Sequence, residues 1–189
     1  MNTPLMMEPI TGASPRFKAR MAGALNLFSL LTAGFTELFV RGWLKYAGGY
    51  IAICGMVVVT LLLYGLFKPV NRSLSLLAAS FNFVGLTFEA LRWQPRGINI
   101  AIVFVGFYCL LFAYLIFRST FLPRILGALF AFAGLGWLTY MSPPLANNLS
   151  PYNLAAGLLG EGSVFLWLLV MGVNVQRRKE RAGAAAVRA

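Results

Sequence analysis

The most regular feature of the chain is a series of long apolar runs separated by short polar breaks. A helix needs about 20 apolar residues to cross a hydrocarbon core roughly 30 Å thick, and each run approaches that length. The breaks contain Lys, Arg, Pro and Gln, which are typical of turns and helix ends. The pattern predicts six membrane-spanning helices, at Met21–Val40, Ala47–Phe67, Leu74–Leu91, Ile98–Phe117, Ile125–Met141 and Leu154–Val175.

The basic residues are distributed unevenly between the two sides of such a bundle. An even number of spans places both termini on one side, and 12 of the 16 Lys and Arg residues fall there, against 4 on the other side. Cytoplasmic segments of membrane proteins carry an excess of Lys and Arg. We therefore expect an all-α integral membrane protein, a bundle of six transmembrane helices with both termini in the cytoplasm (N-in/C-in).

The two ends of the chain differ from its apolar middle. Ser14 followed by Pro15 is typical of a helix N-cap with proline at the first helical position. We therefore expect a flexible N-terminal tail at 1–13 and the six-span transmembrane domain at 14–175. Residues 176–189 form a basic, Ala-rich segment. Because Lys and Arg next to a span are drawn to anionic lipid headgroups, we expect a basic cytoplasmic tail that contacts them.

Composition excludes several classes of protein. Only 11% of the residues are charged and the mean hydropathy is +0.76, whereas a soluble domain has about 25% charged residues. The net charge is +11, but the basic residues form no stripe of the kind that binds nucleic acid. The chain has no His, which excludes His-ligated haem, zinc and copper sites and imidazole catalysis. We expect the lipid bilayer as surroundings, with no metal, no cofactor and no nucleic acid; the sequence does not indicate protein partners.

Cysteine and aromatic residues have simple expected roles. Cys54 and Cys109 are expected as small buried apolar residues, and their depths differ by roughly 6 Å at about 1.5 Å per residue, which disfavours a disulfide. Several aromatic residues near the outer interface indicate an aromatic belt. They are Trp43, Trp93, Trp137, Tyr140 and Tyr152.

Three acidic residues, Glu37, Glu89 and Glu161, lie inside the predicted spans. An ionisable residue costs about 2.5–3.5 kcal/mol at the centre of a span on insertion scales, which makes each a candidate for a functional site. All three fall in the half of the bilayer away from the cytoplasm. Asn82, seven residues before Glu89, and Arg92, three residues after it, lie on or near the same helix stripe. An ion pair from Arg92 to Glu89 or Glu161 would lower the cost of burial.

Small residues surround the deepest of the three carboxylates. Gly160 and Gly162 flank Glu161, and Ala156 precedes Gly160 by four residues. Small residues at this spacing let a second helix backbone approach closely. Gly127 and Gly134 in the fifth run are expected to pack in the same way.

The candidate site residues are therefore Glu37, Glu89, Glu161, Arg92 and Asn82, and three functions fit them. The first is binding or moving a small cationic or protonatable ligand through an outer-leaflet carboxylate cluster. The second is a structural or accessory membrane subunit, in which these residues only fix the helices or reach the headgroups. The third and weakest is an intramembrane enzyme acting on a lipid-like substrate, because no nucleophile–base pair is present and no catalytic residue can be assigned.

Several segments also follow the pattern of a known family. The most specific runs from Arg118 through Pro123 to Gly127, and others are Arg20–Gly23, Glu37–Arg41, Leu63–Leu74, Ala133–Trp137 and Glu161 with Leu166–Leu169 and Gly172–Asn174. Over roughly 17–174 the chain resembles a bacterial membrane family known as domain of unknown function 4386. The resemblance implies a multi-pass protein of the bacterial inner membrane, and it supplies no reaction.

Overall fold

The computed structural model describes residues 14–178 and 180, apart from the side chains of Glu37 and Leu38. The expected tail at 1–13 lies outside these residues, as does most of the segment 176–189. Within the described part the regular structure is helical. The helices are α1 (Pro15–Phe39), α2 (Trp43–Phe67), α3 (Arg72–Leu91), α4 (Ile100–Arg118), α5 (Arg124–Leu138), α6 (Pro143–Asn148) and α7 (Tyr152–Val170), with 3-10 turns at Pro95–Gly97 and Thr139–Met141.

Polar caps fix where several helices begin. The Ser14 hydroxyl accepts a hydrogen bond from the Phe17 amide at 3.2 Å, with Pro15 as the first helical residue, as expected. Asn71 and Asn99 cap α3 and α4 in the same way, each through its side-chain oxygen. These oxygens satisfy amide groups that have no partner within the helix.

The last helix is shorter than predicted. It ends at Val170, whereas the apolar run continues to Val175. Gly172 follows with φ of +69°, a conformation that glycine adopts at little cost, and its amide donates to the Trp167 carbonyl at 3.2 Å. The chain therefore turns away from the helix axis before the apolar residues end.

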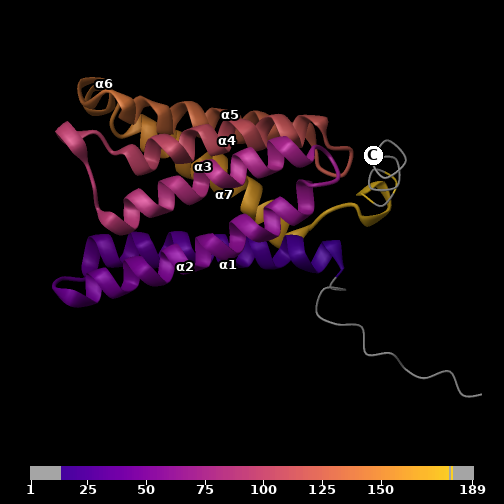
Figure 1. Cartoon of the computed structure of the whole chain (residues 1–189), viewed down its shortest axis with the longest axis horizontal. Coiled ribbons are helices and arrows are strands. Elements are labelled where there is room, and N and C mark those ends of the chain that lie inside the picture. The colour runs from indigo at the N-terminus through magenta and orange to yellow at the C-terminus, as the bar shows by residue number, and fades with distance from the viewer. Residues whose placement is uncertain (1–13, 179, 181–189) are drawn as a thin grey trace, which may run out of the picture.

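The six long helices form a closed ring. Each packs against its neighbours in the sequence, and α7 closes the ring by packing against both α5 and α1 (Figure 1). Ser14 and Met171 lie at one end of the bundle with the α2–α3 and α4–α5 connections; we call this the tail end. The α1–α2 and α3–α4 connections and the short α6 lie at the other end, which we call the loop end.

The distribution of polar and apolar side chains is that of a membrane protein. Large apolar side chains face outward, as Leu31 at 71% and Phe35 at 60% exposure illustrate, while Asn26, Asn82 and Glu161 are buried inside. Five of the described helices, α2 to α5 and α7, are long and apolar enough to cross a membrane, with α5 counted to Met141. Together these features indicate a multi-pass membrane protein.

The helix α1 is not among those five, although it has 25 residues, as many as α2. Its first turns carry Arg16, Lys18 and Arg20, and its middle carries buried Asn26 and Ser29. These residues lower its mean hydropathy relative to the other long helices, and Glu37 and Leu38 near its end are not described in full. The predicted count of six membrane spans is therefore supported for five helices and stays a prediction for α1.

The half of the ring interior nearer the tail end is filled with aromatic side chains. Phe67, Tyr108, Phe112, Phe130 and Phe165 are all almost fully buried, and their ring centroids lie 4.9 to 6.1 Å apart along the series. These distances and the edge-to-face angles are favourable for aromatic pairs. We call this cluster the aromatic half.

Close backbone approach between helices takes place at small residues, as expected. A Cβ on Gly134 would lie 2.9 Å from the Gly106 carbonyl oxygen of α4, and one on Gly127 would lie 3.1 Å from the Ala113 carbonyl oxygen. On the other face of α5, Gly160 of α7 contacts the Leu129 carbonyl. Because α5 is held closely on both sides, its side chains have a fixed position relative to α4 and α7.

Candidate functional site

A cavity of about 350 Å³ occupies the ring interior on the loop-end side of the aromatic half. Residues of α1, α2, α3, α4, α5 and α7 line it. Its wall is largely apolar, and small residues at many positions leave the space open. These residues are Ala33, Gly49, Ala52, Gly85 and Ala101. We call this region the cavity half.

The carboxylate of Glu161 lies in the cavity wall and is held by two neutral donors. Its Oε1 accepts hydrogen bonds from the Trp137 indole Nε1 at 2.6 Å and from the Cys109 Sγ at 3.3 Å. All three residues are buried. They come from α7, α5 and α4 respectively, so one carboxylate oxygen connects three helices of the ring.

Glycines position this group. A Cβ on Gly157, one turn before Glu161, would overlap the Trp137 indole ring, so the ring can lie against α7 only because this residue is glycine. A Cβ on Gly160 would overlap the backbone of α5 at Leu129. The small residues around Glu161 therefore bring Trp137 within hydrogen-bond distance, as the spacing rule for small residues implies.

No Lys or Arg side chain lies against Glu161 within the described part of the chain. Among the described residues Glu161 has no hydrogen bond from Lys or Arg; its side-chain partners there are Trp137 and Cys109. Ionisable groups inside a membrane protein are normally paired or face a water-filled cavity. Glu161 lines the cavity and is not paired with a cation among the described residues.

Two further polar groups on the wall are left without hydrogen bonds. The Oδ1 of Asn26 and the Oγ of Ser29, both on α1, are buried and have no partner among the described residues. Buried polar atoms in proteins are nearly always hydrogen-bonded, and each exception requires an explanation. The face of α1 toward the cavity thus lacks donors for these two oxygens.

Of the predicted site residues Glu89 and Arg92, one lines the cavity and one lies outside it. Glu89 lines the cavity toward the loop end and is solvent-exposed. Arg92 lies outside the wall, with its guanidinium 4.1 Å from the centre of the Tyr46 ring, and it forms no ion pair with Glu89 or Glu161 among the described side chains. A cation–π contact thus replaces the expected ion pair. Glu37 lies on α1, but its side chain is not described.

Asn82 belongs to a separate polar contact. Its Nδ2 donates to the Thr60 Oγ1 at 2.6 Å, and Thr60 in turn donates to the Met56 carbonyl at 2.7 Å. Asn82 and Thr60 are both fully buried and neither lines the cavity. The hydrogen bond joins α3 to α2 and is part of the packing of the ring.

Sequence patterns did not identify Trp137, Cys109 and Ser29 as parts of this region. Trp137 was expected in an aromatic belt, and this is wrong, because it is buried and bonds to Glu161. Cys109 is buried as expected, whereas the same prediction for Cys54 is wrong, because Cys54 is exposed on α2. The glycines beside Glu161 indicated that a neighbouring helix approaches there. They did not indicate that this helix contributes Trp137 as the partner of Glu161.

Comparisons with known proteins agree with the resemblance found in the sequence. Residues 86–172 match the model of a family described as Domain of unknown function (DUF4386). The chain resembles that family. The matched segment includes Cys109, Trp137 and Glu161, the three groups that meet at the carboxylate.

A relative is also found among archaeal proteins. An uncharacterized protein from Archaeoglobus fulgidus is 27% identical over 136 residues, which is 66% of this chain and 82% of that protein. No solved structure matches the chain. Among the described residues no group of three His, Cys, Asp or Glu side chains could hold a metal ion.

Proposed function

We propose that the cavity half binds a small organic cation, an apolar molecule with one protonated amine, and that Glu161 supplies the counter-charge. The observation that carries this proposal is the position of Glu161, a carboxylate in the wall of an apolar cavity that has only neutral donors around it. A ligand ammonium group would provide the missing positive charge. Because the rest of the wall is largely apolar, the remainder of the ligand would be apolar too.

The size and the hydrogen-bonding capacity of the cavity are consistent with such a ligand. A volume of about 350 Å³ lies within the usual range of small-molecule sites, roughly 300–1,000 Å³. An ammonium group has up to three donors. One would be directed to Glu161, and the others would be available to the part of the wall where Asn26 and Ser29 have unpartnered oxygens.

The test compares two probes of the same shape, cyclohexylamine and cyclohexanol, on protein purified in nanodiscs. Isothermal titration should show binding of the amine to the wild type and much weaker binding of the alcohol. The variant Glu161→Gln keeps an oxygen acceptor for Trp137 and Cys109 but removes the charge. It should lose amine affinity by about tenfold or more, since hydrogen bonds to charged groups contribute about 1.5–3 kcal/mol.

The matched control is Glu180→Gln, which removes a carboxylate that is exposed and far along the chain from the cavity. It should leave amine binding unchanged. Equal binding of amine and alcohol to the wild type would contradict the proposal, because the carboxylate would then have no part in recognition. Full amine affinity in a folded Glu161→Gln protein would contradict it as well.

One observation favours a structural role as a second candidate function. The Oε1 of Glu161 joins α4, α5 and α7, so the residue could serve only to fix these helices. In that case Glu161→Gln would lower the unfolding temperature, and neither probe would stabilise the wild type. The binding proposal expects ligand-dependent stabilisation of the wild type, so the two roles give different results in the same thermal unfolding experiment.

The full topology belongs to the proposal too. We infer that α1 is a sixth span and that both termini are cytoplasmic, as the excess of Lys and Arg at the tail end supports. The antiparallel packing of α1 along α2, each with 25 residues, also supports it. A reporter that fluoresces only in the cytoplasm should be active when fused to either terminus. Activity at one terminus alone would exclude an even number of spans.

A further inference from the structure

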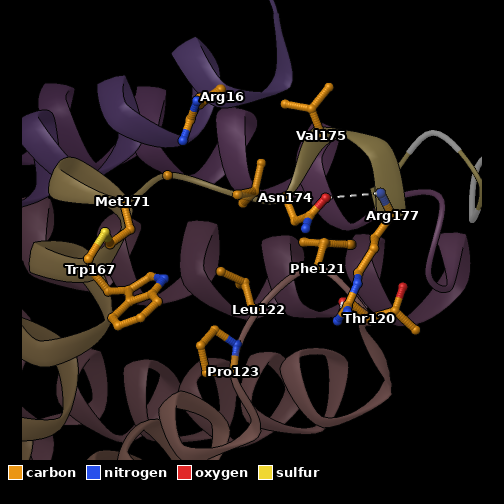
Figure 2. Close-up of a pocket in the computed structure, with 12 residues that line it drawn as sticks. Arg16, Thr120, Phe121, Leu122, Pro123, Trp167, Met171, Asn174, Val175 and Arg177 are labelled. Atoms are coloured by element: carbon orange, nitrogen blue, oxygen red, sulfur yellow. Dashed lines mark hydrogen bonds between the residues drawn. The ribbon is translucent and has the colours of Figure 1, made fainter.

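We propose a second binding site, at the tail end, for an anionic phospholipid. Its headgroup phosphate would bind between Arg16 and Arg177, and an acyl chain would lie in the adjoining groove between α5 and α7. This site is separate from the cavity half, and the proposal does not depend on the cation-binding function. It rests on a pocket of about 560 Å³ formed by the start of α1, the α4–α5 connection and the segment that follows α7 (Figure 2).

The pocket is positively charged and has no acidic residue in its wall. Arg16 forms no hydrogen bond or ion pair with the other described residues, and the Arg177 Nη1 donates only to the Thr120 carbonyl, at 3.4 Å. Figure 2 shows Arg16 and Arg177 on different segments, and both line the pocket. Guanidinium groups match the geometry of phosphate oxygens, so two arginines without acidic partners favour an anion.

The segment that carries Arg177 is held against the bundle. Gly172, at φ +69°, turns the chain out of α7, and a Cβ there would come 2.9 Å from the Arg16 Cγ. The Asn174 amide donates to the Phe121 carbonyl at 3.3 Å. The Arg177 amide donates to the Asn174 Oδ1 at 3.2 Å (Figure 2). The pocket is therefore a defined feature of the fold, with Arg177 placed by hydrogen bonds and the Arg16 side chain packed beside Gly172.

An apolar groove adjoins this pocket, and it favours a lipid over a free phosphate as the ligand. It has a volume of about 330 Å³ and lies on the outer face of the bundle, between α5 and α7. Trp167 and Met171 line both the pocket and the groove. The groove continues along Leu166 and Val170, which face outward. A molecule that fills both spaces has an anionic head and a hydrocarbon chain.

The position within the bundle supports the same ligand. Arginines at the border between headgroups and hydrocarbon attract anionic lipids, each by about 1 kcal/mol near the membrane surface. Trp167 lies at the junction of pocket and groove, where an indole is half apolar and half polar, as at membrane interfaces generally. Two nearby arginines already donate hydrogen bonds within the protein. Arg20 donates to the Val170 carbonyl, and Arg178 donates to the carbonyls of Leu66 and Gly65.

The experiment is a titration of delipidated full-length protein in detergent, followed by thermal unfolding and by native mass spectrometry. The probes are phosphatidylglycerol, phosphatidylcholine and glycerol 1-phosphate. Phosphatidylglycerol at saturation should raise the unfolding temperature by about 5 °C and remain bound in the mass spectrum. Phosphatidylcholine and glycerol 1-phosphate should each give less than half of that shift.

The variants test the two arginines directly. The double variant Arg16→Gln/Arg177→Gln should lose most of the shift and the bound lipid, whereas Arg16→Lys/Arg177→Lys should keep part of both. The matched control is Arg124→Gln, an exposed arginine at the tail end that does not line the pocket, and it should behave like the wild type. If the double glutamine variant does not fold, each single variant is titrated, and each should lose part of the bound lipid.

Four results would overturn the proposal. An equal shift with phosphatidylcholine would mean that the negative charge is not recognised. An equal shift with glycerol 1-phosphate would mean that the groove contributes nothing and that the ligand is a soluble phosphate. Full retention of phosphatidylglycerol by the glutamine variants, or its equal loss in Arg124→Gln, would remove the two arginines from the site.

Discussion

The aromatic half and the cavity half are built from the same helices, but their interiors differ in residue size. Toward the tail end, Phe67, Phe112, Phe130 and Phe165 fill the ring with edge-to-face contacts. Toward the loop end, glycine and alanine line the same ring and leave about 350 Å³ open. Helix packing alone therefore does not decide whether a membrane bundle is solid or hollow; the side chains that point into the ring decide it.

The boundary between the halves falls on two consecutive residues of α4. Tyr108 packs its ring against Phe112 and Phe130, while Cys109 donates to the carboxylate of Glu161. Buried polar atoms without a partner among the described residues occur in both halves: Asn26 and Ser29 lie on the cavity wall, whereas Tyr108 belongs to the aromatic half and Ser75 and Asn82 lie outside the wall. The two halves therefore differ in open volume, and not in whether buried polar atoms have protein partners.

This difference bears on the choice between binding and transport. A ligand that enters from the loop end would meet Glu89 first and Glu161 deeper in the cavity. Beyond Glu161 the interior is closed by the aromatic half, so passage to the tail end requires several buried rings to move. The observed arrangement is therefore closed toward the tail end, and a transport cycle would need a second arrangement of these rings.

The largest expected effect comes from opening the aromatic half. Phe130→Ala removes a ring that is 1% exposed and contacts Tyr108 and Phe165. We expect the free energy of unfolding to fall by about 3 kcal/mol, because large-to-alanine changes at buried positions leave a void whose lining loses its contacts. Reversible unfolding in mixed detergent micelles measures this value.

The matched control for this change is Phe132→Ala, two residues along the same helix. Phe132 is 55% exposed on the outer face of the bundle, so its removal should cost less than about 0.5 kcal/mol. Equal losses from Phe130→Ala and Phe132→Ala would mean that the aromatic half is not tightly packed. The contrast between the two halves would then fail.

The sequence predicted the helices better than their interior. The apolar runs located all six long helices, since helix formation in a membrane is required by backbone hydrogen bonding. The N-cap at Ser14 and the small-residue contacts of Gly134 and Gly160 were also correct, because both depend on local geometry. The end of α7 was misplaced, because Gly172 stops the helix while the apolar pattern continues.

The candidate site could be predicted only in part. Glu89 and Glu161 were expected at similar depth in one half of the bilayer, because an ionisable residue within an apolar span is rare enough to be recognised from sequence alone. Both line the cavity, which their depth alone did not predict. Asn82 was placed with them from its helix stripe, but it turns to Thr60 on the neighbouring α2. Sequence spacing shows which residues share one face of a helix. Which side chain of the next helix they contact depends on how that helix is rotated and shifted along its axis.

An intermediate change in the free energy of unfolding is expected when one alanine in each half is replaced by leucine. Ala113→Leu adds a larger side chain beside the aromatic half, where Ala113 is 2% exposed, and we expect a loss of about 1–3 kcal/mol from overpacking. Ala52→Leu makes the same change in the cavity wall, where stability should stay within about 0.5 kcal/mol of wild type or increase. Unfolding in detergent gives both values.

The same pair of variants sharpens the functional proposal. Ala52→Leu fills part of the cavity and should weaken binding of cyclohexylamine by at least about tenfold, a loss of roughly 1.4 kcal/mol, while Ala113→Leu should leave it unchanged if the protein folds. Greater destabilisation by Ala52→Leu than by Ala113→Leu would show that the cavity half is no looser than the aromatic half.

The smallest expected effect concerns Asn82, the buried polar residue that the structure separates from the cavity. A double-mutant cycle with Asn82→Leu and Thr60→Val should give a coupling of about 0.6 kcal/mol, the average for interhelical hydrogen bonds in a membrane protein. Neither variant should change amine binding, since neither residue lines the cavity. Loss of binding in Asn82→Leu as large as in Glu161→Gln would extend the ligand site from the cavity half to the Asn82–Thr60 contact. It would also restore the grouping of Asn82 with the carboxylates that the helix stripe predicted.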